Sequence, residues 1–203
     1  MNQAESKLTE LRVDQALLDR MARAVERVRE RLDRATRALE IAEVPYAVAD
    51  DNAVATWVAR ADESAVRNTP DVDILLRRSD LEAADIALSA AGFVCRVVNG
   101  TQMFLDGSNA RPRDAVHIMF AEEKVRIDDI RPAPDVSESE SGPGFRVLAF
   151  EPLITMLLVS FRSKDRMHLR DMLEVGLVDE TWLVRMPDEL SSRLKELLDD
   201  PDG

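Results

Sequence analysis

Two aspartates one residue apart, Asp71 and Asp73, precede an apolar run and are the side chains of this sequence most suited to chemistry. Successive side chains of a strand point to opposite faces, so these carboxylates share one face at a spacing of roughly 7 Å. Val72, Ile74 and Leu76 then lie on the other face. Two carboxylates this close repel each other unless water, a cation or a base lies between them. The pair is therefore a candidate cation site.

The same pair has a purely structural interpretation. Asp71 and Asp73 could form the polar end of a strand and pair with Arg67 or Arg77. A surface ion pair of this kind contributes little to stability. His117, in an apolar stretch, has a similar alternative as a half-buried histidine whose hydrogen bonds are satisfied. Residue types alone leave these alternatives open.

A second set of polar residues follows helical spacing. Lys164, His168 and Asp171 stand at positions i, i+4 and i+7, which places them on one stripe of a helix. This stripe either faces a bound nucleotide or holds the helix against a sheet by hydrogen bonds. The structural interpretation is preferred here.

The composition is that of a globular protein. The chain has 203 residues, of which 45% are hydrophobic and 33% charged, enough for one substantial domain with an appendage. Its net charge of −12 argues against general nucleic-acid binding, because phosphate binding needs a basic surface. It contains one cysteine and no apolar stretch of membrane-helix length, and its first ten residues lack the apolar core of a signal peptide. We therefore expect a cytoplasmic protein with no membrane partner and no intrachain disulfide.

Residues 1–43 are expected to form an N-terminal helical arm. Between Thr9 and Glu43 there is no Gly or Pro, and apolar residues recur at spacings of three and four. This pattern predicts an amphipathic helix. Its length is unusual for a globular helix, so the helix either lies across its own domain or forms the seam of a homodimer.

Beyond this arm, strands and helices alternate, and the chain ends in helices. We expect an α/β core over residues 44–150 and a helical region over 151–203, which makes the fold class α+β. A polar turn is predicted at 50–52 and a polar loop at 132–144. The predicted strands cover 45–50, a run that starts at 71, 93–98, 101–106, 115–121 and 145–150; the predicted helices cover 53–61, 79–91, 151–163, 165–176 and 187–199.

The order of these elements and motifs resembles the nucleotidyltransferase fold. A strand, a turn and a helix are followed by R-x-T-x-D-x-D at the start of the next strand, and then by a helix that ends in Gly-Phe. The similarity is nearest the small abortive-infection (AbiEii-like) group; it covers residues 45–120 well and 151–175 loosely. It implies a mixed β-sheet flanked by helices. Asp71 and Asp73 would be the catalytic pair that holds Mg²⁺, with Mn²⁺ as the alternative ion, against the phosphates of an NTP.

The resemblance also implies which residues contact the nucleotide. Arg67 and Thr69 stand where a cation and a hydroxyl can contact phosphate oxygens. Asp51 and Asn52 stand at the turn before the first helix of the fold. Lys164 follows the helix in which the family places a lysine, and it is a further candidate for binding the nucleotide.

Three positions depart from the family's pattern. At the turn where the family has Gly-Gly or Gly-Ser this chain has Asp50-Asp51, and two carboxylates there would repel phosphate. The neighbouring strand offers His117 at the slot of a third carboxylate, so His117 is a candidate metal ligand, and Asp114 is the poorer substitute. The expected helix after residue 150 contains no lysine.

Two classes of function follow. The first is a metal-dependent nucleotidyltransferase that moves an NMP from an NTP onto an unknown acceptor, with a toxin-like role as one form of it. The second is a catalytically degenerate module of the same fold that binds a nucleotide or a protein. Asp71 and Asp73 favour the enzyme, whereas Asp50-Asp51 and the absent lysine favour the module. We keep the enzyme as the main hypothesis.

Overall fold

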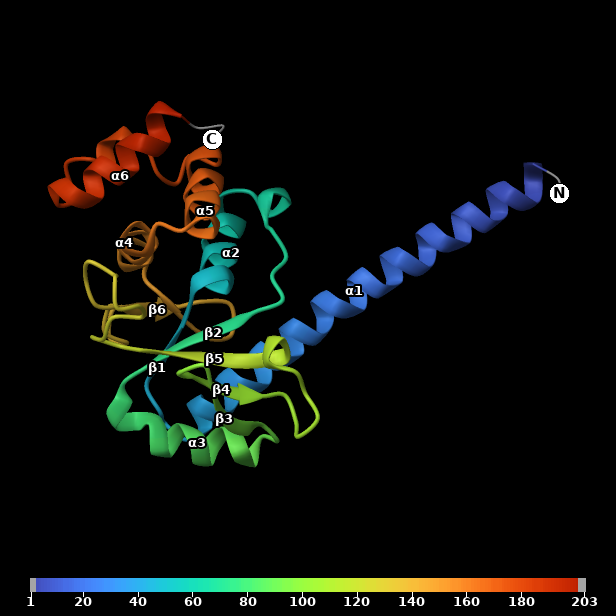
Figure 1. The fold of residues 1–203 in the computed structure, drawn as a ribbon, viewed down its shortest axis with the longest axis horizontal. Helices are drawn as coiled ribbons and strands as arrows, with labels where there is room; N and C mark the ends of the chain where they lie inside the picture. The colour runs from blue at the N-terminus through green and yellow to red at the C-terminus, as the bar shows by residue number, and fades with distance from the viewer. Residues whose placement is uncertain (1–2, 201–203) are drawn as a thin grey trace.

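A mixed β-sheet forms the centre of the protein. The structure is a computed structural model that describes the backbone of residues 3–200 and the side chains of residues 15–200. Within residues 3–200, seven strands pair in the order β3-β4-β5-β2-β1-β7-β6 (Figure 1). The strands are β1 (Tyr46–Ala49), β2 (Val72–Leu76), β3 (Val94–Val98), β4 (Thr101–Leu105), β5 (Ala115–Phe120), β6 (Ser139–Ser141) and β7 (Arg146–Leu148).

Helices cover both faces of this sheet. One face carries α2, α4, α5 and α6, and the other carries α3 and the C-terminal part of α1 (Figure 1). The expected α+β class with a helical arm and a helical tail is confirmed. The helices are α1 (Gln3–Ile41), α2 (Asp50–Ala61), α3 (Leu81–Ala90), α4 (Phe150–Ser160), α5 (Ser163–Glu174) and α6 (Asp188–Asp199).

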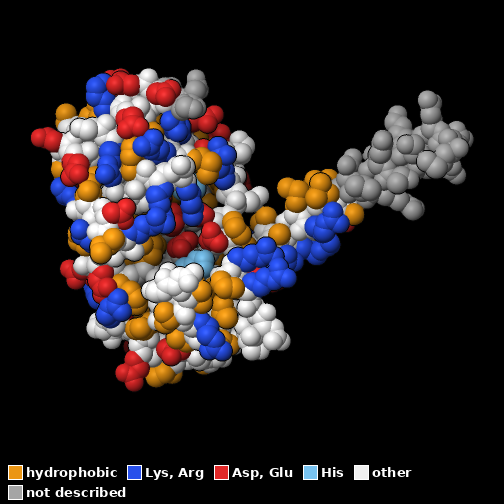
Figure 2. All heavy atoms as spheres, viewed as in Figure 1, with side chains coloured by type: hydrophobic (Ala, Val, Ile, Leu, Met, Phe, Trp, Pro, Cys, Tyr) orange, Lys and Arg blue, Asp and Glu red, His pale blue; other side chains and the backbone are white. Residues whose placement is uncertain are grey.

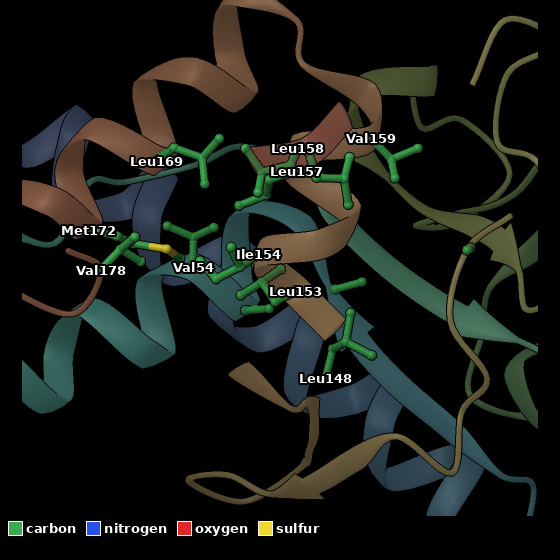
Figure 3. Packing of buried hydrophobic residues seen from close by; sticks show 14 of the residues in the cluster. Val54, Leu148, Leu153, Ile154, Leu157, Leu158, Val159, Leu169, Met172 and Val178 are labelled. Atoms are coloured by element: carbon green, nitrogen blue, oxygen red, sulfur yellow. The ribbon is translucent and has the colours of Figure 1, made fainter. Parts of the chain in front are cut away.

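The two larger hydrophobic cores lie on the two faces. Val72, Ile74 and Leu76 of β2 belong to the core under α1 and α3, whereas Leu75 belongs to the core under α2 and α4. This alternation follows from the strand period of two, and it leaves Asp73 on the same face as Leu75. In the second core, apolar side chains of α2, α4 and α5 interdigitate above β7 (Figure 3). The helices that carry candidate site residues are therefore fixed by packing.

The N-terminal half of α1 projects away from the domain (Figure 1). Leu32, Ala35 and Leu39 are buried against the sheet, whereas Leu18 and Met21 of the projecting part are 58% and 56% exposed. The helix thus lies across its own domain with one part only, and its apolar stripe continues beyond the domain. Within residues 3–200, every helix is too short or too polar to span a membrane.

One predicted loop contains a strand. Residues 132–144 were expected to be a polar loop. This prediction is wrong at β6, which pairs with β7 in antiparallel register through Glu140 and Val147. Its sequence, Ser-Glu-Ser, has no apolar alternation. An edge strand needs only backbone pairing, and here Arg60 contributes an ion pair to Glu140. Polar edge strands of this length give no hydrophobic signal in a sequence.

Candidate functional site

The ends of three neighbouring strands gather the predicted acidic residues. In the β1–β2 ladder, Ala49 is opposite Asp73, and in the parallel β2–β5 ladder, Asp73 is opposite His117. The Nδ1 atom of His117 lies 3.7 Å from Oδ1 of Asp73. Asp71 immediately precedes β2, partly buried, on the same face as Asp73. The two aspartates and His117 therefore lie close together where β1 ends and β2 and β5 begin.

Neither arginine that could have neutralised the aspartates does so. Arg67 makes a two-bond ion pair with Asp171 of α5, with distances of 2.6 and 2.8 Å. Arg77 pairs with Asp135 instead, at 2.6 Å. The alternative in which one of these arginines pairs with Asp71 or Asp73 is therefore wrong.

Strand β1 runs directly into α2, without the polar turn predicted at 50–52. Asp50 is the first helical residue, and its φ of +48° lies in the left-handed region that favours glycine. The position thus keeps the backbone geometry for which a glycine is suited, although its side chain is a carboxylate. Both Asp50 and Asp51 lie in the first turn of α2, where the partial positive charge of the helix N-terminus favours negative groups.

Basic side chains from α5 contact both of these carboxylates. The Nζ atom of Lys164 lies 3.3 Å from Oδ2 of Asp50 and 2.9 Å from Oδ1 of Asp51. His168 Nε2 lies 2.6 Å from the same Asp51 oxygen, and the Thr69 hydroxyl donates a hydrogen bond to Asp51 Oδ2. Burial alone would raise the pKa of Asp51, but these three partners outweigh it and hold that pKa well below its usual range. Asp51 is thus ionised and neutralised in place.

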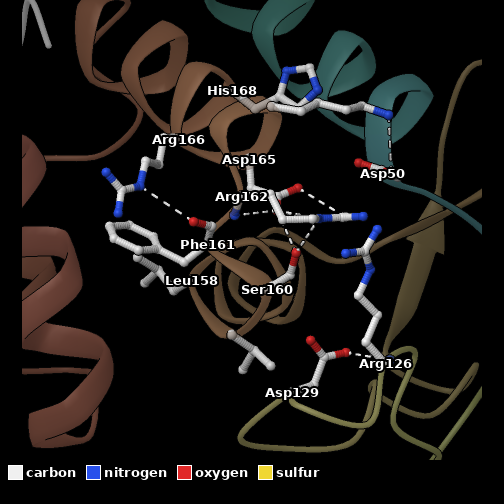
Figure 4. A network of polar contacts seen from close by, with 12 residues as sticks. Asp50, Arg126, Asp129, Leu158, Ser160, Phe161, Arg162, Asp165, Arg166 and His168 are labelled. Atoms are coloured by element: carbon white, nitrogen blue, oxygen red, sulfur yellow. Dashed lines mark hydrogen bonds and ion pairs between the residues drawn. The ribbon is translucent and has the colours of Figure 1, made fainter.

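The junction between α4 and α5 positions Lys164. Asp165 Oδ2 accepts hydrogen bonds from the Arg162 backbone and its Nε atom, at 2.8 and 2.9 Å, and from the Ser160 hydroxyl. These contacts cap the start of α5 and fix the direction of its first turn (Figure 4). Figure 4 also shows Asp50 and His168 beside this junction. The backbone at Lys164 is therefore held in place by these capping contacts.

A cleft of about 520 Å³ opens beside these residues. Its volume falls in the range of small-molecule sites, roughly 300 to 1,000 Å³. Figure 2 shows acidic and basic side chains around a hollow at the middle of the domain. The polar residues that line the cleft are Asp51, Arg67, Asn68, Thr69, Asp71, Lys164, His168 and Asp171.

Comparison with known proteins supports the architecture. No protein-family model and no curated protein sequence matches the chain. The chain is similar in structure to an antigenic nucleotidyltransferase-like protein from Paracoccidioides brasiliensis, with a TM-score of 0.54 and 16% identity over 87% of this chain and 90% of that chain. The fold is nucleotidyltransferase-like.

Two further solved structures are less similar to this chain. The antibiotic-resistance factor ANT(2'')-Ia has a TM-score of 0.47 and 10% identity, over 82% of this chain and 88% of that chain. JHP933 from Helicobacter pylori has a TM-score of 0.48 and 15% identity, over 88% of this chain and 75% of that chain. At these levels of identity the similarity concerns the fold only.

Within this fold, the predicted residues fall into two groups. Arg67, Thr69, Asp71 and Lys164 line the cleft together with Asp51. The side chains of His117, Asp73 and Asn52 are not part of its lining, and Asn52 instead donates a 2.7 Å hydrogen bond to the backbone oxygen of Asp71, so it holds the start of β2. Asp114 does not line the cleft either, and it forms an ion pair with Arg31 at 3.6 Å.

A buried cluster next to the predicted aspartates also has the composition of a metal site. One ligand atom each from Asp50, Asp51 and His168 lie within 4.8 Å of one another. No metal role was expected for Asp50 or His168 from the sequence, although the helical spacing of Lys164 and His168 indicated that these two side chains act together. In this cluster, Asp51 already accepts hydrogen bonds from Lys164 and His168, so an ion would have to displace them.

Two other carboxyl groups here are hard to ionise. Burial, and next the charge of Asp73, raise the pKa of Asp50 to about 6. Burial and Asp73 also raise the pKa of Asp71. The neighbouring carboxylate of Asp73 raises the pKa of His117 in turn. The site therefore carries excess negative charge that protons or cations relieve.

Asp50→Asn is expected to stabilise the protein at pH 8 by about 1 to 3 kcal/mol. The folded pKa of about 6 lies above the unfolded value, so ionised Asp50 destabilises the fold fully above pH 6, and this penalty disappears as the pH falls below the unfolded pKa. Asparagine also tolerates the positive φ well. Urea unfolding with a chelator at pH 8 and pH 3.5 measures both effects. An equal ΔΔG at the two pH values would contradict the prediction.

Proposed function

We propose that the protein is a metal-dependent nucleotidyltransferase that transfers an NMP from an NTP to an acceptor. The observation that carries this proposal is the convergence of Asp71, Asp73 and Lys164 beside the N-terminus of α2. Asp71 and Lys164 line an adjacent cleft that is large enough for a nucleotide. A helix N-terminus and a lysine favour phosphate, and paired carboxylates favour the divalent ion that accompanies it. The nucleotidyltransferase-like fold supports the same reaction class.

The donor set at Asp73 fits a divalent ion. Asp73 is only 8% exposed, and its Oδ2 atom is buried without a hydrogen-bond partner among the described residues. Burying an oxygen without a hydrogen-bond partner destabilises the fold unless a ligand supplies the missing contact. Asp71 and Asp73 would hold the ion, with His117 beside them, and carboxylate oxygens suit Mg²⁺ or Mn²⁺. When bound, the ion neutralises charge on the phosphoryl group being transferred.

The protein's own residues have positioning roles in this proposal. Lys164, held between Asp50 and Asp51, moves its ammonium group to the incoming phosphates. The Thr69 hydroxyl and the exposed guanidinium of Arg67 lie along the cleft wall, where they contact the nucleotide. The first backbone amides of α2, at Asp51 and Asn52, point to the phosphates as unpaired helix N–H groups do.

Finer assignments rest on the resemblance of the R-x-T-x-D-x-D motif. On this resemblance we propose that the protein is nearest the AbiEii-like group and has a toxin-like role in the cytoplasm. Growth arrest on expression, relieved in an Asp73→Asn variant, would support this role. Normal growth on expression at high level would contradict it.

A second candidate function is a catalytically degenerate module that binds a nucleotide or a protein. The observation that favours it is the replacement of the glycine pair by Asp50 and Asp51, both of which are buried and engaged by α5. In such a module, Lys164 stays in its ion pairs permanently. The enzyme would bind an NTP and turn it over. The module would bind an NTP without turning it over, or would bind no NTP.

Calorimetric titration with each NTP, with and without Mg²⁺ or Mn²⁺, tests the proposed function. We expect NTP binding that requires the ion, followed by incorporation of label from an α-³²P-labelled NTP into an acceptor in cell extract. Binding without any transfer would favour the module. The absence of NTP binding at every ion concentration would overturn the enzyme.

We also propose that the projecting part of α1 forms a homodimer seam. Leu18, Met21 and Val25 continue the three- and four-residue spacing of the buried Leu32 and Ala35, and they are exposed in the single chain. A continuous heptad stripe of this kind favours a second copy of the helix. In sedimentation velocity, the wild type should be a dimer and a Leu18→Glu, Met21→Glu variant a monomer. A monomeric wild type would refute the seam.

A further inference from the structure

His117 has the hydrogen-bond geometry of a metal-ligating histidine. Its Nε2 atom lies 3.1 Å from the backbone oxygen of Pro112. Because a carbonyl oxygen only accepts hydrogen bonds, Nε2 carries the hydrogen in this contact, and the other ring nitrogen is the one left for a ligand. Histidines that bind metals are commonly oriented through such a bond from the second nitrogen to a backbone carbonyl.

The free nitrogen faces the neighbouring carboxylate at a distance that suits a shared ion. His117 Nδ1 and Asp73 Oδ1 are 3.7 Å apart, which is too long for a hydrogen bond. An ion with bonds of about 2.1 Å places adjacent ligand atoms roughly 3 to 4 Å apart. The parallel register of Asp73 and His117 keeps both side chains on one face. Backbone pairing therefore fixes the two donors relative to each other.

The second oxygen of Asp73 gives independent support. Oδ2 is buried without a hydrogen-bond partner among the described side chains and backbone. Burying a carboxylate oxygen without a partner destabilises the fold, so its retention points to a ligand that supplies the missing contact. Asp71, one residue before β2 on the same face, adds a further oxygen donor.

We infer that this ion site is a mixed oxygen–nitrogen site, formed by Asp71, Asp73 and His117, that selects divalent transition-metal ions such as Mn²⁺ over Mg²⁺. Imidazole nitrogen binds transition metals well, whereas Mg²⁺ prefers an all-oxygen shell and gives up its water reluctantly. The inference rests on the proposed function, because it assigns the cofactor of that same site. It makes His117 the residue that determines which ion the protein uses.

The test measures binding of Mn²⁺ alone, by the electron paramagnetic resonance signal of the free ion, and competition by Mg²⁺. We expect the wild type to bind Mn²⁺ at least tenfold more tightly than Mg²⁺. His117→Asp supplies a third carboxylate, so it should reduce the Mn²⁺/Mg²⁺ affinity ratio at least tenfold. His117→Ala should weaken Mn²⁺ without strengthening Mg²⁺, and it serves if the aspartate variant does not fold.

The outcomes separate this inference from the proposed function. If Asp73→Asn abolishes ion binding while both His117 variants keep the wild-type ratio, His117 is no ligand and only this inference fails. If the wild type binds neither ion, with or without an NTP, the inference and the proposed function fail together. A wild-type ratio near one also overturns the selectivity, even if nucleotide binding is intact.

Discussion

Asp73→Asn is expected to abolish ion-dependent NTP binding, with a loss of affinity of at least about a hundredfold, or roughly 2.7 kcal/mol. Asp73 lies between Asp71 and His117, and one of its oxygens is buried without a partner, so an amide would remove the central charge of the ion site. Stability should be unchanged or slightly higher, because its charge raises the pKa of both Asp50 and Asp71. Calorimetric titration with an NTP and Mn²⁺ measures the affinity, and thermal unfolding measures the stability.

A matched control is available on α1. Asp33 is exposed and lines the groove between α1 and α3, outside the cleft, so Asp33→Asn removes the same charge without touching the site. It should bind NTP like the wild type. Asp71→Asn should resemble Asp73→Asn, with a smaller loss because Asp71 is less buried. Wild-type affinity in both site variants would exclude the aspartates as ion ligands, whatever the behaviour of the control.

The aspartate pair was accessible from sequence because strand alternation is a local property. The period of two that places Asp71 and Asp73 on one face also places Val72, Ile74 and Leu76 in the opposite core, as the structure has it. The order of the elements followed from turn residues and apolar runs in the same way. The polar strand β6 carries no such signal, and its pairing to β7 was missed.

The basic half of the site could not be predicted from spacing. His168 and Asp51 are separated by 117 residues, and their 2.6 Å contact depends on how α5 packs against α2. The helical stripe showed that Lys164 and His168 share a face, but residue types do not specify what that face meets. The departure at Asp50-Asp51 likewise suggested repulsion of phosphate, whereas the structure places the Lys164 ammonium between these carboxylates.

Lys164→Met is expected to lower NTP affinity by at least about tenfold, equivalent to roughly 1.4 kcal/mol, while leaving Mn²⁺ affinity unchanged or higher. The charged hydrogen bond to phosphate is lost, but the carboxylates that attract the ion are no longer neutralised by the ammonium group. Burial would lower the pKa of Lys164, yet Asp50 and Asp51 raise it above its usual range, so the side chain is charged at every relevant pH.

The same variant should destabilise the protein by about 1 kcal/mol, a modest amount because the Lys164 side chain is 36% exposed and solvent screens part of its interaction. Lys164→Arg keeps the charge and should recover most of the stability. Lys195→Met is the matched control, because Lys195 forms an exposed pair with Asp199 on α6, away from the cleft lining. An NTP affinity equal to that of Lys195→Met would show that Lys164 never leaves Asp50 and Asp51. The degenerate module would then explain the site better than the enzyme, since a lysine that serves only to neutralise two buried carboxylates has no part in binding a nucleotide.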